Sequence, residues 1–424
     1  MSDDASTPTQ KLTDARMQAK AVAGSVTDFK PGQSLPSRAS WFTDETNERL
    51  VVVADPDAPQ AAVDKAFAYA LAWQHDRDLI LILTPEQAPP ALHRLPWIGT
   101  PVQVWTVTDG SEPRPVVVPT RDEVLAYTAQ WPVYGGAGHD LGDGAAWVAA
   151  LTEAADAHWA LARHDRASYL AWHCAGHRVL QMRKTAKVVL ITAGVQYRHP
   201  KEGQEPPQIE RVTAALSPGE RARIEAVIAK AVSNRLNHID NSDVESRMQA
   251  VLAAADMPGL DLVLEHAREY PAWRPIGRRG FLDFLGIDAH NRLHVVETKV
   301  GGDGMLVIQA LDYLIWVTAQ AGRIRADRGW PAPEIEGRVH LDLVLAPKHG
   351  APALGPYTAG QLEALAGDVP WRVFLVADPH APTPKVEELP RQAIHDPQDG
   401  LVATPVQPPR FAGRIQRQLR DTSP

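Results

Sequence analysis

The chain has 424 residues, of which 44% are hydrophobic and 22% charged, and its formal net charge is −8. This length predicts two or three domains, and the acidic balance excludes a chain coated with basic residues for nucleic-acid binding, though not a local basic groove. A single cysteine excludes an intrachain disulfide, and the sequence has neither the apolar run of a signal peptide at its start nor one long enough to cross a membrane. We therefore expect a cytoplasmic protein with no membrane contact.

The first part of the chain predicts a flexible segment followed by an α/β module. Residues 1–47 are polar and show little periodicity, which favours a flexible lead-in with at most one short helix. Continuous apolar runs then predict strands over 50–54, 79–83 and 102–107, with a helix over 61–73 and a short Pro-bounded helix before the third strand. This alternation of strands and helices is typical of a small parallel α/β unit.

A β-rich segment and a linker are expected next. A Gly-rich loop over 135–144 precedes an Ala-rich stretch that predicts a helix to about residue 163, and the segments 168–178 and 179–197 predict a hairpin or small antiparallel sheet. We assign 48–200 to an N-terminal α/β module that includes this β element. Residues 201–212 contain Pro, Gly and many charges and are interpreted as the linker between domains.

The remainder predicts a second domain over 213–385 and a Pro-rich tail over 386–424 that ends in a short basic helix. Helices are expected over 217–236, 242–255, 304–321 and 359–366, and strands near 261–267, 339–346 and 372–377. Between them, two apolar runs flank a polar turn over residues 280–299, which is the pattern of a β-hairpin.

The register of this hairpin brings charged residues together. With a three-residue loop over 289–291, Asp288 pairs with Arg292, and counting back along both strands places Asp283 opposite Glu297. Side chains alternate along a strand, so Glu297 and Lys299 share one face, which Asp283 joins.

Two facing carboxylates among apolar neighbours repel each other and lose hydration, and a divalent cation relieves both penalties. Mg²⁺ or Mn²⁺, held by Asp283 and Glu297 together with water and a phosphate, suits such a site. Lys299 adds positive charge where a nucleophilic water or a scissile phosphate would lie. Taken alone, the same short pattern also fits an ordinary hairpin with an exposed acidic face.

Two flanking helices strengthen the first interpretation. Gln309 and Tyr313 lie four residues apart, hence on one face of the helix expected after the hairpin, and Glu245 lies on the amphipathic helix expected before it. This order, with Asp283 on one strand and Glu297-Thr-Lys299 on the next, resembles the PD-(D/E)xK nuclease superfamily, in particular its RecB-like branch. The resemblance covers roughly residues 240–380.

The resemblance implies a restriction-endonuclease-like mixed sheet flanked by helices, and phosphodiester hydrolysis that depends on Mg²⁺ or Mn²⁺. It implies that Asp283, Glu297 and the carbonyl after Glu297 hold metal, that Glu245 holds a second ion or a water, and that Gln309 and Tyr313 orient substrate or site groups. Glu265 and Glu269 are alternatives for the role of Glu245.

The resemblance also implies a nucleic-acid substrate, with DNA favoured over RNA, in repair or in defence against foreign DNA. Three arginines just before the first strand, Arg274, Arg278 and Arg279, could bind backbone phosphates or could pair with local carboxylates. The N-terminal half could carry a homodimer or protein interface.

Two other interpretations of the sequence remain open. A catalytically silent adaptor could reuse the nuclease fold to hold nucleic acid or protein. An ordinary hairpin protein would keep Glu245, Gln309 and Tyr313 far from Asp283.

Overall fold

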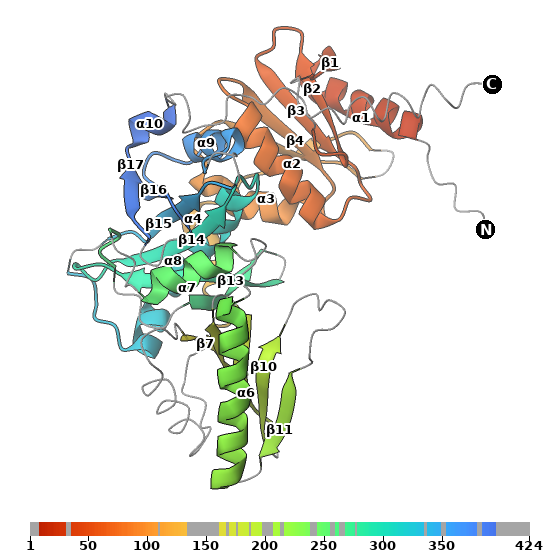
Figure 1. Ribbon diagram of the computed structural model, residues 1–424. Coiled ribbons are helices and arrows are strands. Elements are labelled where there is room, and N and C mark those ends of the chain that lie inside the picture. The colour runs from red at the N-terminus through yellow and green to blue at the C-terminus, as the bar shows by residue number, and fades with distance from the viewer. Residues whose placement is uncertain are drawn as a thin grey trace, which may run out of the picture.

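The structure is a computed structural model. It describes residues 8–30, 35–108, 111–133, 161–166, 169–174, 177–185, 188–196, 207–212, 216–237, 244–254, 259–262, 268–275, 278–334, 337–348, 353–379 and 384–395. The fold is mixed α/β, and the residues just listed form three open sheets, arranged from the N-terminal module at the top of Figure 1 to a long helix and an antiparallel sheet at the bottom.

The first sheet has six strands in the order β1-β2-β3-β4-β5-β6. They are β1 (Val26–Asp28), β2 (Ala39–Asp44), β3 (Arg49–Ala54), β4 (Asp78–Leu83), β5 (Val102–Thr106) and β6 (Arg114–Pro115). Strands β3, β4 and β5 run parallel, which confirms the expected α/β unit. Their apolar runs are continuous because both faces of the sheet are buried: Leu50 and Val52 face one hydrophobic cluster, and Val51 and Val53 face another.

Helices cover both faces of this sheet. One face carries α2 (Gln60–Trp73) and α3 (Ala88–Arg94), which continues into the short 3₁₀ helix η1 (Leu95–Trp97). Helix α4 (Arg121–Thr128) follows β6. It begins with a capping box, in which the Thr120 side chain accepts from the Glu123 N–H and the Glu123 carboxylate accepts from the Thr120 N–H.

The expectation of a flexible lead-in over 1–47 is wrong for most of its described residues. Helix α1 (Pro8–Ala23) and strands β1 and β2 belong to the first sheet and its cover. Ala15 and Ala19 of α1 are buried against Phe42, Val51 and Ile80. Alanines give a helix a weak apolar signature in sequence, yet they let it approach a sheet closely, so burial here exceeds what the polar composition indicated.

The second sheet is antiparallel and has five strands in the order β11-β10-β9-β8-β7. They are β7 (Leu161–Arg166), β8 (Tyr169–Cys174), β9 (His177–Lys184), β10 (Val189–Gln196) and β11 (Gln208–Val212). The expected small antiparallel sheet is thus present, but it takes in two segments that the sequence analysis assigned differently. β11 lies in the expected linker, and β7 begins where a helix was expected to continue; the Gly-rich loop over 135–144 lies outside the described residues.

Helix α6 (Pro218–Asn237) covers this antiparallel sheet. Ile224, Ile228 and Val232 form its apolar face and pack on Trp172 and Leu180. The β element therefore shares its core with α6, which the sequence analysis placed in the next domain. Strand β7 in turn contacts β12 of the third sheet.

The third sheet has six strands in the order β12-β13-β14-β15-β16-β17. They are β12 (Arg268–Arg274), β13 (Arg278–Ile287), β14 (Leu293–Val300), β15 (His340–Ala346), β16 (Trp371–Val376) and β17 (Val386–Leu389). Strands β14, β15 and β16 are parallel and the other neighbours antiparallel, so the sheet is mixed. The strand expected near 261–267 begins instead at Arg268, and β17 lies in what was expected to be tail because it pairs with β16.

Helices cover both faces of this sheet. Helix α8 (Leu306–Arg328) packs on one face, and α7 (Val244–Ala254) packs on the other through Met248 and Leu252. Helix α9 (Pro356–Glu363) links β15 to β16, and α10 (Arg391–His395) follows β17. The basic helix expected over 410–420 lies outside the described residues.

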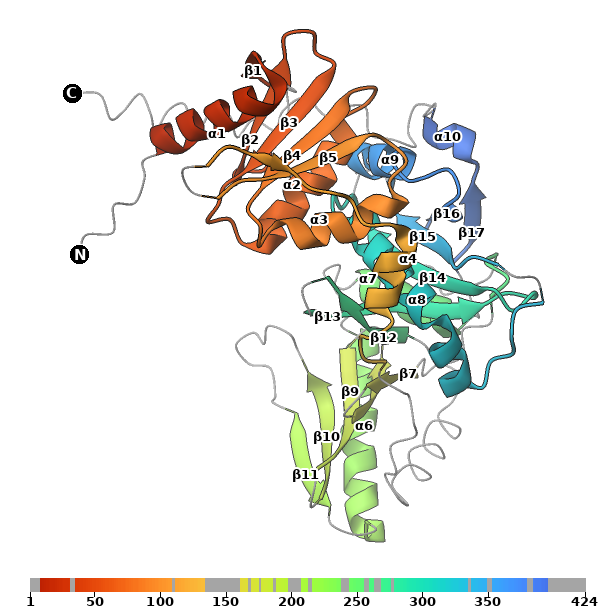
Figure 2. The same cartoon turned by 180° about the vertical axis from the view of Figure 1, so that it is seen from behind.

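The first and third sheets belong to one packed body. Helix α2 contacts α9, and α4 lies along α8, as Figure 2 shows. A Cβ on Gly360 of α9 would lie 2.9 Å from the carbonyl oxygen of Ala72, and one on Gly99 would lie 2.9 Å from the Cα of Ala366. The N-terminal module (residues 8–133 as described) is therefore in direct backbone contact with the helix and turn that join β15 to β16.

Among the described residues, no helix combines the length and the apolar character that crossing a bilayer requires.

Candidate active site

The hairpin of β13 and β14 has the register that the sequence predicts. Paired residues run from Ile287 opposite Leu293 to Phe284 opposite Val296, and the Asp288 N–H donates to the Arg292 carbonyl. Asn291 closes the three-residue loop with a left-handed φ of 60°, a conformation that Asn tolerates.

The regular pairing of the two strands stops one residue before Asp283 and Glu297. From there, side chains accept the hydrogen bonds of the backbone N–H groups. The Asp283 N–H donates to Glu297 Oε1 at 3.0 Å, and Asp283 Oδ2 accepts from the Thr298 N–H at 2.8 Å and from Thr298 Oγ1 at 2.7 Å. Alternation is also broken in β13, since Leu282 packs in the same hydrophobic cluster as Leu285. The two strands thus separate at the point where the acidic residues meet.

Glu297 is buried in an environment that disfavours its charge. It is 6% exposed, and burial together with the nearby Asp283 carboxylate raises the pKa of Glu297 well above its usual value. The Asp283 N–H and the Arg274 guanidinium act in the opposite direction. A positive charge at this position would therefore be strongly stabilising.

Glu245 of α7 reaches the same strand end. Its carboxylate accepts from Lys299 Nζ at 3.1 and 3.2 Å and from the Val300 N–H at 3.1 Å. Burial alone would lower the pKa of Lys299, but Glu245, Asp303 and Asp283 outweigh burial, and the pKa of Lys299 is raised. Lys299 is therefore a fixed cation at neutral pH and cannot accept a proton.

Tyr313 of α8 lies on the other side of the acidic pair. Burial, followed by the charge of Glu297, raises its pKa, so its phenol stays protonated. A Cβ on Gly280 of β13 would lie 2.5 Å from Tyr313 Oη, so a glycine is what lets this ring pack over the strand. Gln309 is half-buried one turn earlier, and its side chain makes no hydrogen bond within the described part of the chain.

Two residues that the sequence analysis missed support Asp283. Gln249 of α7 donates to Thr298 Oγ1 at 2.7 Å, and the Thr298 hydroxyl in turn donates a hydrogen bond to Asp283 Oδ2. Gln249 is 7% and Thr298 2% exposed. A signal was available in the sequence, because Glu245 and Gln249 are four residues apart and so share a face of α7.

The three arginines expected to contact phosphate are placed unequally. Arg274 of β12 donates from Nε to Asp312 Oδ2 at 3.1 Å, so it does pair with a carboxylate, although its side chain stays 24% exposed. Arg278 and Arg279 lie in β13 opposite Arg274 and Trp273, and their side chains are outside the described residues, as are those of Glu265 and Glu269.

The donors for a cation are present in part. No set of three His, Cys, Asp or Glu side chains is grouped to hold a metal ion in the described part of the chain. Asp283 and Glu297 are nevertheless adjacent carboxylates whose mutual repulsion a cation would relieve. This pair suits Mg²⁺, which commonly takes one or two protein carboxylates and fills its remaining positions with water and phosphate.

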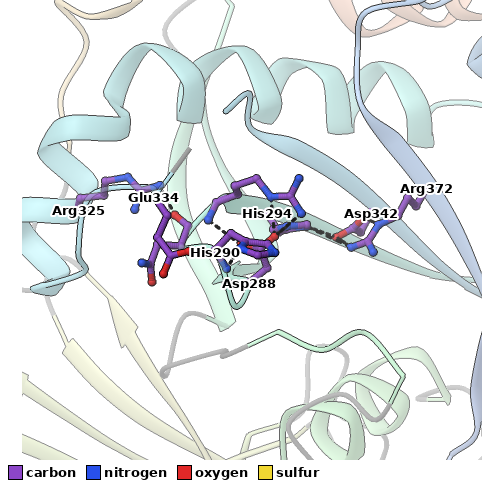
Figure 3. A network of polar contacts seen from close by, with 9 residues as sticks. Asp288, His290, His294, Arg325, Glu334, Asp342 and Arg372 are labelled. Carbon is purple, nitrogen blue, oxygen red and sulfur yellow. Dashed lines mark hydrogen bonds and ion pairs between the residues drawn. The ribbon is translucent and has the colours of Figure 1, made fainter. Parts of the chain in front are cut away.

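A second polar cluster, at the opposite end of β14, holds the sheet together. His294 is 1% exposed, and its Nδ1 lies 2.6 Å from Asp342 Oδ2; Arg372 donates to both oxygens of Asp342 at 2.8 and 2.9 Å (Figure 3). Asp288, at the hairpin turn, also belongs to this cluster, because its Oδ2 lies 3.5 Å from His294 Nε2. These groups tie β14, β15 and β16 in register, which fixes the strand that carries Glu297 and Lys299.

The comparisons with known proteins found no relative: no family model matches the chain, and neither does any curated protein or solved structure.

Proposed function

We propose that this chain is a metal-dependent nuclease that hydrolyses phosphodiester bonds, with its active site where β13 and β14 separate. The observation that carries the proposal is the convergence of Glu245, Asp283, Glu297 and Lys299, from one helix and two strands, with Tyr313 over them. An ordinary hairpin would leave Glu245 and Tyr313 remote. DNA is the proposed substrate on the sequence resemblance.

Asp283 and Glu297 would hold Mg²⁺ or Mn²⁺. Bound there, the ion would lower the pKa of a coordinated water and neutralise charge on the phosphate under attack. Hydrogen bonds from Thr298 hold one oxygen of Asp283, and the Asp283 N–H holds one oxygen of Glu297, so both carboxylates are oriented by neighbouring groups before an ion binds. Such preorganisation lowers the cost of placing charge at the site.

Lys299 acts as a cation. Because Glu245 keeps it protonated, it donates hydrogen bonds to the attacking water or to a phosphate oxygen and stabilises the negative charge that develops there. Glu245 accepts from both Lys299 and the next backbone N–H, so it fixes the end of the strand as well as the ammonium group.

The test is cleavage of single- and double-stranded DNA in Mg²⁺ or Mn²⁺ by the wild type, Asp283→Ala and Lys299→Ala. The proposal expects metal-dependent cleavage that both substitutions reduce by about a hundredfold or more, as loss of a preorganised charge does. Lys20→Ala, at an exposed position of α1, is the matched control and should cleave like the wild type.

A folded wild-type protein that neither cuts any nucleic acid nor gains stability from the metal would refute the proposal. In that case binding of uncleaved DNA would favour the adaptor interpretation instead.

A further inference from the structure

A buried ionic chain crosses from the N-terminal module to the candidate active site. Arg94, at the end of α3, is 1% exposed, and its guanidinium donates to both oxygens of Asp312 on α8, at 2.7 and 2.8 Å. Its third nitrogen donates to Asp64 of α2 at 2.8 Å. Asp312 is fully buried and accepts in addition from Arg274 Nε.

Asp312 is therefore shared by two arginines with different surroundings. Arg94 is enclosed and has acidic partners on two sides, so it has no capacity to bind substrate. Arg274 uses one N–H on Asp312, remains partly exposed, and makes no other hydrogen bond within the described residues. The N–H groups of its two terminal nitrogens make none of these bonds, and they have the fork geometry that matches a phosphate.

Arg274 lies beside the acidic pair. Its charge acts on both Glu297 and Tyr313, and a Cβ on Gly280 would lie 3.0 Å from its Cδ and 2.5 Å from Tyr313 Oη. Arg274 and Tyr313 therefore both pack against Gly280. A guanidinium held from behind by a buried carboxylate keeps its position better than a free surface arginine, which matters because small displacements of a catalytic group are costly.

We infer that Arg94 and Asp312 are positioning residues, through which the N-terminal module holds Arg274 in place to bind the phosphate under attack. This inference rests on the proposed nuclease function. It makes the N-terminal module necessary for the geometry of the site, so the module is more than a separate accessory domain. Asp64 shares the task, because it fixes the one guanidinium nitrogen of Arg94 that Asp312 does not use.

The experiment measures single-turnover cleavage and DNA binding in Ca²⁺ for Arg274→Gln, Arg274→Lys and Arg94→Lys. Arg274→Gln should lower the cleavage rate about a hundredfold. Arg94→Lys keeps the charge but loses the planar fork that pairs with both oxygens of Asp312, and should lower the rate about tenfold or more with little loss of DNA affinity. Arg121→Lys is the control, since Arg121 pairs across the same interface with Asp368, away from the site.

Non-additivity separates positioning from general damage to the fold. If Arg94 acts through Arg274, the Arg94→Lys substitution should cost little extra in an Arg274→Gln background. Equal multiplicative losses in both backgrounds, or a rate for Arg94→Lys equal to that of Arg121→Lys, would overturn the inference.

A readout without cleavage keeps the inference distinct from the proposed function. Arg94 and Arg274 donate to the same carboxylate of Asp312, so their contributions to stability should be coupled. In urea unfolding, the loss of stability in the Arg94→Lys/Arg274→Gln double variant should differ from the sum of the two single losses, even if the wild type cuts nothing. Additive losses would refute the positioning role.

Discussion

Replacement of Glu297 by glutamine measures how strongly the candidate site disfavours the charged form of this carboxyl. Burial and Asp283 raise the pKa of this carboxyl well above the 4.5 of a free glutamate. Between that value and its folded-state pKa, the folded protein binds more protons at this position than the unfolded chain does. The free energy of unfolding contributed by Glu297 is therefore lost as the pH rises through this window.

The magnitude follows from the linkage relation. Each pH unit inside the window costs the wild type about 1.4 kcal/mol. Glutamine has the same shape, can accept the Asp283 N–H and carries no charge, so Glu297→Gln should become more stable than the wild type by about 1.4 kcal/mol for each pH unit gained inside the window. Other titrating groups are common to both proteins and cancel in the difference.

The assay is urea unfolding of both proteins from about pH 5 to 8, within the range where such linkage is readily measured. Glu86→Gln, at an exposed position, is the control and should follow the wild type at every pH. Mg²⁺ should raise the stability of the wild type at the alkaline end and leave Glu297→Gln almost unaffected. A stability difference that does not change with pH would refute the view that Glu297 is held against its charge.

Three further changes test other parts of the structure. Burial lowers the pKa of His93 to about 4 from 6.5, so the stability that neutral His93 contributes is complete above pH 6.5 and is lost as the pH falls toward 4. In urea unfolding, His93→Phe should flatten the resulting dependence of stability on pH, which amounts to at most about 1.4 kcal/mol per pH unit. An unchanged slope would contradict this assignment to His93. Gly280→Ala places a Cβ 2.5 Å from Tyr313 Oη and should cost about 1–3 kcal/mol of stability and reduce cleavage; a crystal structure with Tyr313 unmoved would show that the strand yields instead. Thr298→Val removes the hydroxyl between Gln249 and Asp283 and with it two buried hydrogen bonds, which should cost about 1–3 kcal/mol, measured by thermal or urea unfolding, whereas Thr298→Ser should be nearly neutral.

The local features of the site could be predicted from the sequence because they depend on short-range rules. Turn length and the period of two along a strand give the register that places Asp283 near Glu297, and the structure has this register. Continuous apolar runs likewise identify β3, β4 and β5, and helical spacing identifies α6 and α7. Each of these signals lies within one element or one hairpin.

Features that depend on contacts between distant segments could not be predicted in the same way. One of the two arginines that pair with Asp312 is Arg94, 218 residues earlier in the chain. A buried arginine with two carboxylates has the same local sequence as a solvated one, so periodicity gives no indication of it. The burial of α1 was missed because alanine carries little apolar signal, and the exchange of hydrogen bonds between Asp283 and Thr298 departs from the regular strand pairing on which the prediction relied.

The separation between Arg94 and Asp312 also has a consequence for biosynthesis. At about 5–20 residues per second, a ribosome needs roughly 10–45 s to travel from one residue to the other. The strands and helices of the N-terminal module are complete within its own 133 residues, yet during this interval Arg94 has only Asp64 as a partner. We expect the nascent module to remain loosely closed around this charge, and to be most vulnerable to proteases and most attractive to chaperones, until α8 leaves the exit tunnel and supplies the second carboxylate.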